Sequence, residues 1–381
     1  KYSAYGGVFF FAILSAERKT HNKIKGCDLM NSLPDTMKAL VVEGVNQLTY
    51  KDVPVPKIKA DEVLVKVKAC GICGSDIPRA KSGGVHFYPI IVGHEFSGEI
   101  AAIGDEVKNA AVGQRVTVAP LVPCFDCENC YKGNPAMCLH YSFIGSRQDG
   151  AMAQYVAVPA KNIVPIADNV SFEHAACIEP ITVAIHGVER AGAIDSGKSA
   201  IVYGCGTIGI LTMQCLKAKG LERVYVIDID DHKLALAKEL GAYETLNSLK
   251  TDIPAYFAER GKVDYVYETA GVNMLQAQVI SLAKKGGSVV YIGTAHRDVT
   301  IPAKTFEQIL RGELHVTGSW QSFSAPFPGH EWIAAAEYLQ SGKVKVDKII
   351  THKFPLSAGM KAFDTLTDKE SRALKVMYTM D

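Results

Sequence analysis

Four cysteines in one short stretch form the most specific chemical signal in the sequence. They follow the spacing Cys-x2-Cys-x2-Cys-x7-Cys, at Cys124, Cys127, Cys130 and Cys138. Four thiolates complete a tetrahedral zinc shell, so the ion would hold a loop in shape rather than take part in a reaction. A nucleic-acid-binding zinc ribbon has similar spacing, but Asp126, Glu128 and the scarcity of basic residues in this stretch argue against contacts with phosphates.

A second set of metal-ligand residue types is dispersed along the chain. Cys73 lies in Gly-Ile-Cys-Gly-Ser-Asp, His94 and Glu95 lie in Val-Gly-His-Glu-Phe, and Glu179 lies in Cys-Ile-Glu-Pro. Each piece is ambiguous by itself, because a histidine beside an apolar run is often structural and Cys70-x-x-Cys73 could be a redox pair. None of these pieces establishes a metal site by itself.

A glycine-rich loop indicates a dinucleotide site. Gly204, Gly206 and Gly209 follow G-x-G-x-x-G between an apolar run and a helical pattern, and Asp228 ends the next strand pattern. The first glycine permits a tight turn, the second admits a pyrophosphate, the third packs helix on strand, and the carboxylate can bind the adenosine ribose. A glycine turn in a nucleotide-free sheet is the alternative.

The residues after Asp228 favour NAD over NADP as the cofactor. Residues 229–232 are Ile-Asp-Asp-His and include no arginine to hold a 2′-phosphate. The cofactor-binding residues that we expect from this loop and its surroundings are Gly204, Gly206, Thr207, Ile208, Gly209, Asp228 and Lys233.

The elements that must position these residues fall into two patterns. From residue 37 to about 165, short β-type runs are broken by Gly and Pro. From about residue 199, apolar strand patterns alternate with amphipathic helical patterns, which is typical of a doubly wound parallel sheet. We therefore expect an α/β protein with a dinucleotide-binding domain over 182–318 and a mostly β domain over 37–181 and 319–381. A helix over 331–341 and a strand near 374–377 would return the chain to the β domain.

Length and charge limit the class of function. At 381 residues, two domains are expected. With 41 Lys and Arg against 40 Asp and Glu, the net charge of +1 makes nucleic acid or a membrane an unexpected partner. Clustered cysteines at metal spacing favour a reducing, cytoplasmic compartment. Residues 1–36 contain a short apolar run that could be a signal-peptide core, but we treat them as an extension outside the fold.

From residue 37 onward, these motifs in this order resemble the zinc-containing medium-chain alcohol and polyol dehydrogenases. The resemblance implies a Rossmann domain, a GroES-like catalytic domain and two zinc ions per subunit. It implies a catalytic zinc on Cys73, His94 and either Glu95 or Glu179, and a structural zinc on the four clustered cysteines. Asp76 would orient His94, Thr182 would position the nicotinamide, and the enzyme would be a homodimer or homotetramer.

Several longer strings resemble the galactitol-phosphate branch of that superfamily. They include Phe-Ile-Gly-Ser-Arg at 143–147, Ile-Glu-Pro-Ile-Thr at 178–182, Gly-Ser-Trp at 318–320 and Pro-Gly-His-Glu-Trp at 328–332. The expected substrate is a sugar alcohol or its phosphate, oxidised at a secondary hydroxyl. An oxygen-rich metal shell that includes Glu179 would suit vicinal hydroxyls. Candidates for binding the phosphate are Arg79, Lys81 and Arg147, each of which could instead be a solvated surface charge.

In the expected reaction, zinc acts as a Lewis acid on the hydroxyl and hydride passes to the nicotinamide. Ser75 is the expected first proton acceptor, although its hydroxyl could cap a helix instead. Many alcohol dehydrogenases have a proton-relay histidine five residues after the zinc cysteine, where this chain has Pro78.

Three other hypotheses, two on function and one on assembly, stay open at this point. The first is a sorbitol, arabitol-phosphate or threonine dehydrogenase of the same architecture, and the second is a zinc-stabilised NADH-binding sensor without activity. The third concerns assembly, because the apolar run at 299–302 could pair across a dimer axis.

Overall fold

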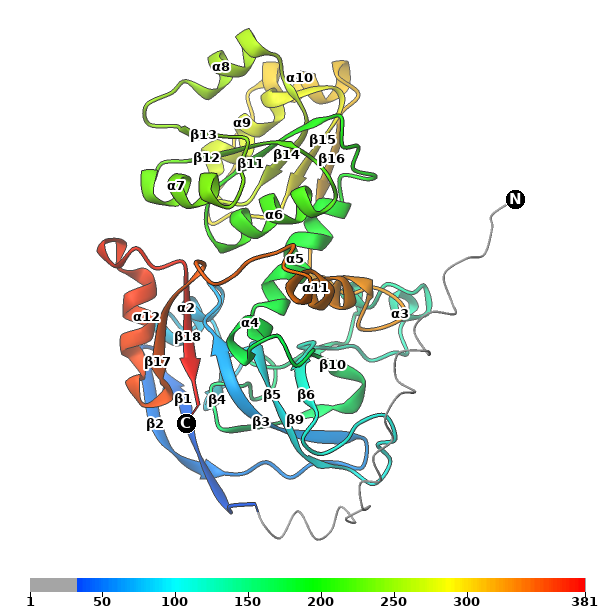
Figure 1. Ribbon diagram of the computed structural model, residues 1–381, viewed down its shortest axis with the longest axis vertical. Coiled ribbons are helices and arrows are strands. Elements are labelled where there is room, and N and C mark those ends of the chain that lie inside the picture. The colour runs from blue at the N-terminus through cyan, green and yellow to red at the C-terminus, as the bar shows by residue number, and fades with distance from the viewer. Residues whose placement is uncertain (1–32, 381) are drawn as a thin grey trace. The chain divides into compact units, whose positions relative to one another are not determined.

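The computed structural model describes residues 33–380, and Figure 1 shows their arrangement. From Asp35 onward the chain forms one unit. Strand β1 (Thr36–Gly44) begins at Thr36, one residue before the predicted start of the fold at residue 37. The apolar run within residues 1–32 lies outside the described residues.

The β-rich part contains three sheets. Strand β1 lies between β2 (Gln47–Pro54) and β4 (Ile90–Ile91) in a three-stranded sheet, and β7 (Leu121–Val122) pairs with β8 (Ser142–Phe143). The largest sheet has the order β10-β6-β5-β3-β18-β17, with β9 also paired to β3. Its strands are β3 (Glu62–Gly71), β5 (Glu95–Ile103), β6 (Arg115–Val118), β9 (Tyr155–Pro159), β10 (Ile163–Pro165), β17 (Ile350–Pro355) and β18 (Lys375–Thr379).

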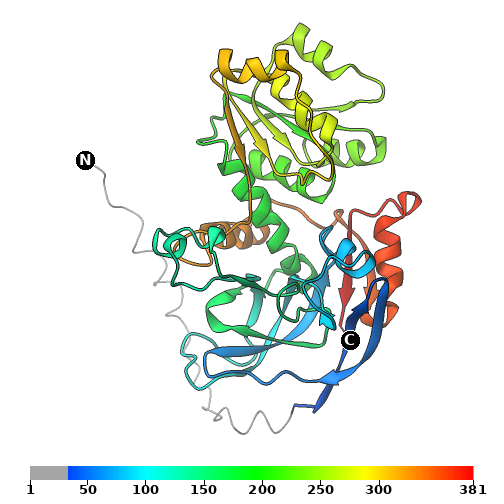
Figure 2. The same ribbon diagram turned by 180° about the vertical axis from the view of Figure 1, so that it is seen from behind.

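The C-terminal strand returns to this large sheet, as the sequence predicts. β18 pairs antiparallel with β3, with Met377 opposite Gly71, so a strand more than 300 residues later in the chain lies beside Cys73. Helix α12 (Met360–Thr367) packs against β18, and Figure 2 shows them together from the other side. The preceding helix, α11 (His330–Gln340), begins and ends one residue before its predicted limits.

The second architecture is a six-stranded parallel sheet with the order β13-β12-β11-β14-β15-β16. In chain order this is the 3-2-1-4-5-6 arrangement of the Rossmann fold. Its strands are β11 (Ser199–Tyr203), β12 (Arg223–Asp228), β13 (Glu244–Asn247), β14 (Val263–Glu268), β15 (Ala283–Tyr291) and β16 (His315–Gly318). The strand β13, with its polar sequence Glu-Thr-Leu-Asn, was not predicted.

Successive side chains of the buried strand β11 point to opposite faces of this sheet, which explains why helices cover both faces (Figure 1). Ala200 and Val202 belong to one apolar core, whereas Ile201 and Tyr203 belong to the other. Successive strand residues point to opposite faces, and an all-apolar strand therefore requires cover on each face. The covering helices are α5 (Ile178–Glu189), α6 (Thr207–Ala218), α7 (Asp231–Glu239), α8 (Ile253–Arg260), α9 (Asn273–Gln278) and α10 (Ala303–Arg311).

Helix α5 spans the predicted domain boundary at residue 182. It packs against α6 of the Rossmann fold and also contacts β5 of the large sheet. The short helix α4 (Phe172–Ala176) precedes it, and α2 (Asp76–Lys81) and α3 (Glu128–Tyr131) interrupt the β-rich part. The helix α5 therefore packs against both the β-rich part and the Rossmann fold.

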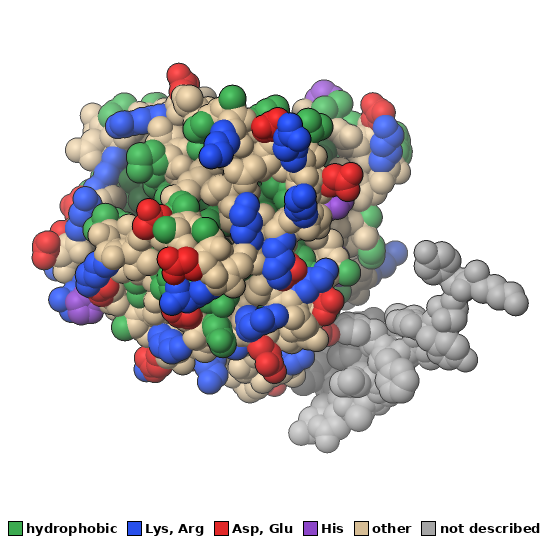
Figure 3. Space-filling model, turned by 90° about the horizontal axis from the view of Figure 1, so that it is seen from above, with side chains coloured by type: hydrophobic (Ala, Val, Ile, Leu, Met, Phe, Trp, Pro, Cys, Tyr) green, Lys and Arg blue, Asp and Glu red, His purple; other side chains and the backbone are tan. Residues whose placement is uncertain are grey.

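The surface shows no dominant charge in the view of Figure 3, where basic and acidic side chains are interspersed. This agrees with the net charge of +1. Within the described part of the chain, no helix combines the length and apolar character needed to cross a membrane. The apolar run at 299–302 forms no strand; it precedes α10, and the sheet edge is the later strand β16.

Candidate metal and cofactor sites

The pairing of β3 with β5 brings the dispersed ligand residues together. Gly71 at the end of β3 lies opposite Glu95 at the start of β5, so Cys73 comes next to His94 and Glu95. The ligand-type atoms of Cys73, His94 and Glu95 lie within 4.8 Å of one another. Cys70 is not part of a redox pair, because its thiol is free and buried, and burial raises its pKa well above the usual range.

Asp76 lies where the resemblance implies. Its buried carboxylate accepts a hydrogen bond from the backbone N–H of Cys73 at 3.1 Å and lies 3.4 Å from His94 Nδ1. Burial alone would lower the pKa of His94, but Asp76 and Cys73 outweigh burial and raise that pKa. A carboxylate behind the imidazole fixes the orientation of the ring, as is usual for metal-binding histidines.

Lys375 is a functional residue that the sequence analysis missed. Its ammonium group lies 2.8 and 2.6 Å from the two carboxylate oxygens of Glu95 and donates to the carbonyl of Ile72. Both charged side chains are buried, so each compensates for the desolvation of the other. Gly71 leaves the room for this pair, since a Cβ there would lie 2.4 Å from Glu95 Oε2. The sequence signal that could have identified this residue is a lysine in the otherwise largely apolar final strand, β18.

Glu179 lies in the first turn of α5, outside the set of three. Burial, with the nearby charges of Glu95 and Asp76, raises its pKa to about 7, although the His94 charge acts in the opposite direction. A buried carboxyl group without a side-chain partner is costly unless it meets a cation or a substrate hydroxyl. The site thus offers the Cys73 thiol, the His94 imidazole and the carboxyl groups of Glu95 and Glu179. These donor types fit zinc.

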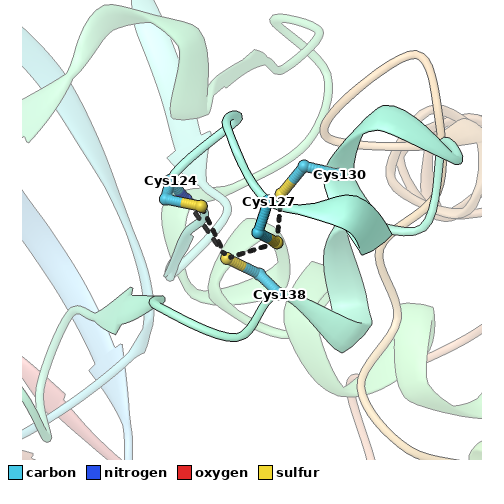
Figure 4. A group of neighbouring side chains, drawn as sticks. All are labelled: Cys124, Cys127, Cys130 and Cys138. Atoms are coloured by element: carbon cyan, nitrogen blue, oxygen red, sulfur yellow. Dashed lines mark hydrogen bonds between the residues drawn. The ribbon is translucent and has the colours of Figure 1, made fainter.

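The four clustered cysteines point toward one another (Figure 4). The Sγ–Sγ distances are 3.4 Å for Cys124–Cys138, 3.6 Å for Cys127–Cys130 and 3.9 Å for Cys127–Cys138. A ZnS4 tetrahedron with bonds of about 2.3 Å has edges of about 3.8 Å, whereas a disulfide needs about 2.05 Å. Backbone N–H groups of Leu139 and Cys130 lower the pKa of Cys127 to about 6, which favours the thiolate. The geometry fits one zinc ion.

The glycine loop has the geometry that the motif predicts. Gly204 has φ +98°, which disfavours residues with a Cβ. A Cβ on Gly209 would lie 1.9 Å from the Gly204 carbonyl, so helix and strand pack too closely for a side chain. Above Gly206 there is open space, and α6 begins directly after it. A pyrophosphate therefore has room at the N-terminus of α6.

Asp228 is the last residue of β12, beside this loop. It accepts hydrogen bonds from the backbone N–H groups of Cys205 at 2.6 Å and Ile229 at 2.8 Å. It also lines a cleft of about 920 Å³ together with Gly204 and Lys233. Of the other expected cofactor residues, Thr207 and Ile208 begin α6, and the Thr207 hydroxyl donates to the carbonyl of Leu374.

The candidate phosphate-binding residues differ in their partners. Arg79 is paired with Asp76 at 2.9 Å, and Lys81 is paired with Asp364 at 2.7 Å. Arg147 is exposed, stacks on the ring of Tyr141, and pairs with no carboxylate of the described residues. Its backbone N–H donates to the carbonyl of Phe143, whose ring lies 5.6 Å from that of His94.

Ser75 and Thr182 differ in their exposure and in their hydrogen bonds. Ser75 precedes α2 without capping it, and its exposed hydroxyl accepts a hydrogen bond from Arg79 at 3.1 Å. Thr182 lies one turn after Glu179 in α5, is fully buried, and donates to the Glu179 carbonyl.

A third group of ligand-type atoms comprises Glu189, His330 and Glu331. His330 lies 2.6 Å from Glu189, Lys219 pairs with Glu189 at 2.9 Å, and Glu331 accepts a hydrogen bond from Ser324. Each carboxylate thus has a partner within the protein, and we interpret this group as an ion-pair network that joins α5 to α11.

A Rossmann sheet, an open thiol–imidazole–carboxylate set and a closed four-cysteine lobe together define a zinc-binding dehydrogenase. Family models agree: residues 59–168 match the alcohol dehydrogenase GroES-like domain and residues 207–340 match the zinc-binding dehydrogenase domain. The chain belongs to the zinc-containing medium-chain alcohol and polyol dehydrogenase superfamily, whose members are oxidoreductases. This confirms the family, the fold class and the enzyme class that the sequence predicted.

Two named dehydrogenases and one crystal structure are similar to this chain over most of its length. Galactitol 1-phosphate 5-dehydrogenase of Escherichia coli K12 is 40% identical over 83% of this chain and 92% of its own length, and sorbitol dehydrogenase of Bacillus subtilis is 32% identical over 92% and 99%. The crystal structure of E. coli galactitol-1-phosphate dehydrogenase has a TM-score of 0.85 and 38% identity, covering 90% of this chain and all of that one.

Two further crystal structures show bound nicotinamide cofactors. An alcohol dehydrogenase from E. coli CFT073 in complex with NADH and a zinc-binding dehydrogenase from Sinorhizobium meliloti bound to NADP have TM-scores of 0.84 and 0.83, each with 32% identity. Each match covers 91% of this chain and all of the other. The cofactor is therefore NAD or NADP, and the substrate is a small molecule.

Proposed function

We propose that this enzyme oxidises a secondary hydroxyl of a sugar alcohol phosphate with NAD, and that galactitol 1-phosphate, converted to tagatose 6-phosphate, is its substrate. The observation that carries the proposal is the convergence of Cys73, His94 and Glu95 in a chain that also presents a dinucleotide loop. The similarity to galactitol 1-phosphate 5-dehydrogenase supports the choice of substrate.

In this proposal each subunit holds two zinc ions. Cys73, His94 and either Glu95 or Glu179 hold the catalytic ion, and the four-cysteine lobe holds the structural one. When bound, the catalytic zinc acts as a Lewis acid that lowers the pKa of the substrate hydroxyl. Lys375 pairs with Glu95, whereas no side chain of residues 33–380 pairs with the Glu179 carboxyl group, which favours Glu179 as the carboxyl group available to zinc or substrate.

Ser75 is our proposed first acceptor of the hydroxyl proton. Its hydroxyl is exposed, makes no capping bond, and lies two residues from Cys73. Arg79 donates a hydrogen bond to Ser75 Oγ. The positive charge of the Arg79 guanidinium group therefore favours the release of the Ser75 hydroxyl proton toward solvent. Pro78 cannot serve as a relay, since its side chain has no titratable group.

NAD is the proposed cofactor. The cleft beside the glycine loop is lined by Asp228 and by no arginine, so it offers a carboxylate to the ribose hydroxyls and no bidentate partner to a 2′-phosphate. Lys250, which also lines the cleft, is paired with Asp231 at 2.6 Å.

Arg147 is the proposed phosphate-binding residue. Its guanidinium group stacks on Tyr141 and pairs with no carboxylate of the described residues, whereas Arg79 and Lys81 already pair with carboxylates. Its backbone N–H donates to the carbonyl of Phe143, whose ring contacts that of His94. Replacing Arg147 with Ala should raise KM for galactitol 1-phosphate by about tenfold or more, because a charge-assisted contact is lost. KM for free galactitol should change by less than about twofold.

The matched control is Lys81→Ala, which removes a cation that is paired with Asp364. It should leave both KM values within about twofold of the parent enzyme. Equal effects of Arg147→Ala on the phosphorylated and free substrates would refute phosphate recognition at this residue.

A substrate panel tests the proposed function as a whole. Galactitol 1-phosphate, arabitol phosphate, sorbitol and threonine should each be offered with NAD and with NADP, and the first substrate with NAD should give the highest kcat/KM. Sorbitol is the second candidate, because a sorbitol dehydrogenase is 32% identical over nearly its full length. A preference for it would overturn the substrate proposal. One zinc per chain with no turnover would support a sensor instead.

We also propose that a second copy of the chain covers α10 and the edge strand β16. No residue of α10 is buried, and Phe306 and Leu310 are 62% and 76% exposed. β16 has a neighbour on one side only. An apolar helix face beside an open sheet edge suits a two-fold contact in which the same surface meets itself. The free thiols of the described cysteines agree with a reducing compartment, for which we propose the cytoplasm.

A further inference from the structure

Phe125 has an unusual place in the four-cysteine lobe. It lies between Cys124 and Cys127 with φ +57°, in the left-handed region that bulky side chains disfavour. The residue is 41% exposed. A glycine would adopt this backbone without strain, so the sequence retains a ring at a position where the backbone does not favour one.

An aromatic row continues from this ring into the segment that follows β16. Phe125 meets Phe327 edge-to-face at 5.4 Å, Phe327 stacks on Phe323 at 6.1 Å, and Phe323 stacks on Trp332 at 5.7 Å. These centroid distances fall within the range of attractive ring pairs. Gly133 of the lobe approaches Ala325 of the same segment, since a Cβ on Gly133 would lie 3.3 Å from the Ala325 side chain.

The row ends on the hydroxyl of Thr182. Trp332 Nε1 donates to the Ser322 carbonyl at 2.9 Å, and Ser322 Oγ lies 2.5 Å from Thr182 Oγ1. Because Thr182 donates its proton to the carbonyl of Glu179, Ser322 donates to Thr182. All of these groups are buried.

A second contact fixes the same segment to α5. Glu331 accepts a hydrogen bond from Ser324 at 2.7 Å and lies 3.1 Å from His186 Nδ1, one turn after Thr182. Residues 322–332 are therefore held to α5 at two points and to the four-cysteine lobe at a third.

We propose that the four-cysteine lobe positions Thr182 through this aromatic row, and that Phe125 and Phe327 are positioning residues for the nicotinamide site. Chains of packed side chains and hydrogen bonds carry coupling of this kind. The inference rests on the proposed function and on the role that the resemblance implies for Thr182, which is to position the nicotinamide. The structural zinc would then have a second consequence besides stability, because the shape of its lobe sets the position of the Phe125 ring.

Titration of NADH into the zinc-loaded enzyme tests this proposal. Phe125→Ala and Phe327→Ala should each raise the Kd for NADH about fivefold and lower kcat, with zinc content unchanged. Phe125→Tyr should restore both values, since it keeps the ring. The double variant should be within about twofold of the more affected single variant, because residues that act in one row are not additive.

Tyr131→Ala is the matched control. Tyr131 belongs to the same lobe and is 73% exposed, and its hydroxyl donates to Asp126, so loss of this side chain should not change the Kd for NADH. If Phe125→Ala behaves like Tyr131→Ala, the proposal is wrong. If the parent protein itself binds no NADH, the proposed function fails instead. The two failures are thus distinguishable.

Discussion

At the scale of single residues, charge balance explains why so many acidic groups can be buried at one place. Asp76, Glu95 and Glu179 are all buried around Cys73 and His94. Arg79 and Lys375 each pair with one carboxylate. Two positive charges of a bound zinc would balance the remaining carboxylate and the Cys73 thiolate, which is why a divalent cation suits this donor set.

Asp228 gives a residue-scale prediction on cofactor choice. Replacing Asp228 with Ser should raise KM for NAD by about tenfold to a hundredfold, because the ribose hydroxyls lose a charged acceptor. KM for NADP should fall, since the repulsion of its 2′-phosphate is removed. Steady-state kinetics with both cofactors measures the ratio, and an unchanged ratio would contradict the role of Asp228.

At the scale of elements, some motifs were predictable because their geometry is local. The four cysteines and the three glycines each lie within one short stretch of the sequence, so spacing alone indicated their roles. The strand β13 was missed because its sequence is polar, and Lys375 was missed because its position depends on the pairing of the distant strands β3 and β18. The predicted boundary at residue 182 falls within α5, a continuous helix that contacts both α6 and β5.

The four-cysteine lobe leads to a prediction on stability. Cys127→Ser should lower the melting temperature of the zinc-loaded protein by about 5 °C or more, because zinc binding contributes directly to folding. Zinc content should fall by one ion per chain. Differential scanning calorimetry with metal analysis measures both, and a melting temperature equal to that of the parent would argue against a structural zinc.

The contact between α5 and α11 gives a pH prediction. Burial alone would raise the pKa of Glu331, but hydrogen bonds from His186 and Ser324 outweigh burial and lower it. A lowered folded-state pKa contributes stability above the unfolded pKa of about 4.3, and this stability is lost as the pH falls through the folded value.

Glu331→Gln should therefore lower the free energy of unfolding at pH 7 by about 1–3 kcal/mol. The difference from the parent should shrink below about pH 4.5. Urea unfolding at a series of pH values measures it, and a constant difference across the series would exclude an ionised Glu331 as the cause.

At the scale of the whole molecule, the proposed two-fold contact places α10 and β16 in an interface. Phe306→Glu should convert the dimer into monomers, because the charge would be buried without a partner. Analytical ultracentrifugation measures the mass. Tyr243→Glu is the control, since Tyr243 is 51% exposed and lies outside α10 and β16. A parent protein that sediments as a monomer would refute the contact.

The central claim is that Cys73, His94 and a carboxyl group hold a catalytic zinc beside a bound nicotinamide. Its most direct test is His94→Ala, with zinc content, NADH affinity and kcat measured on one preparation. We predict that zinc falls from two ions per chain to one, that kcat falls by about a thousandfold or more, and that the Kd for NADH stays within about twofold. Two zinc ions with near-normal turnover would contradict the claim.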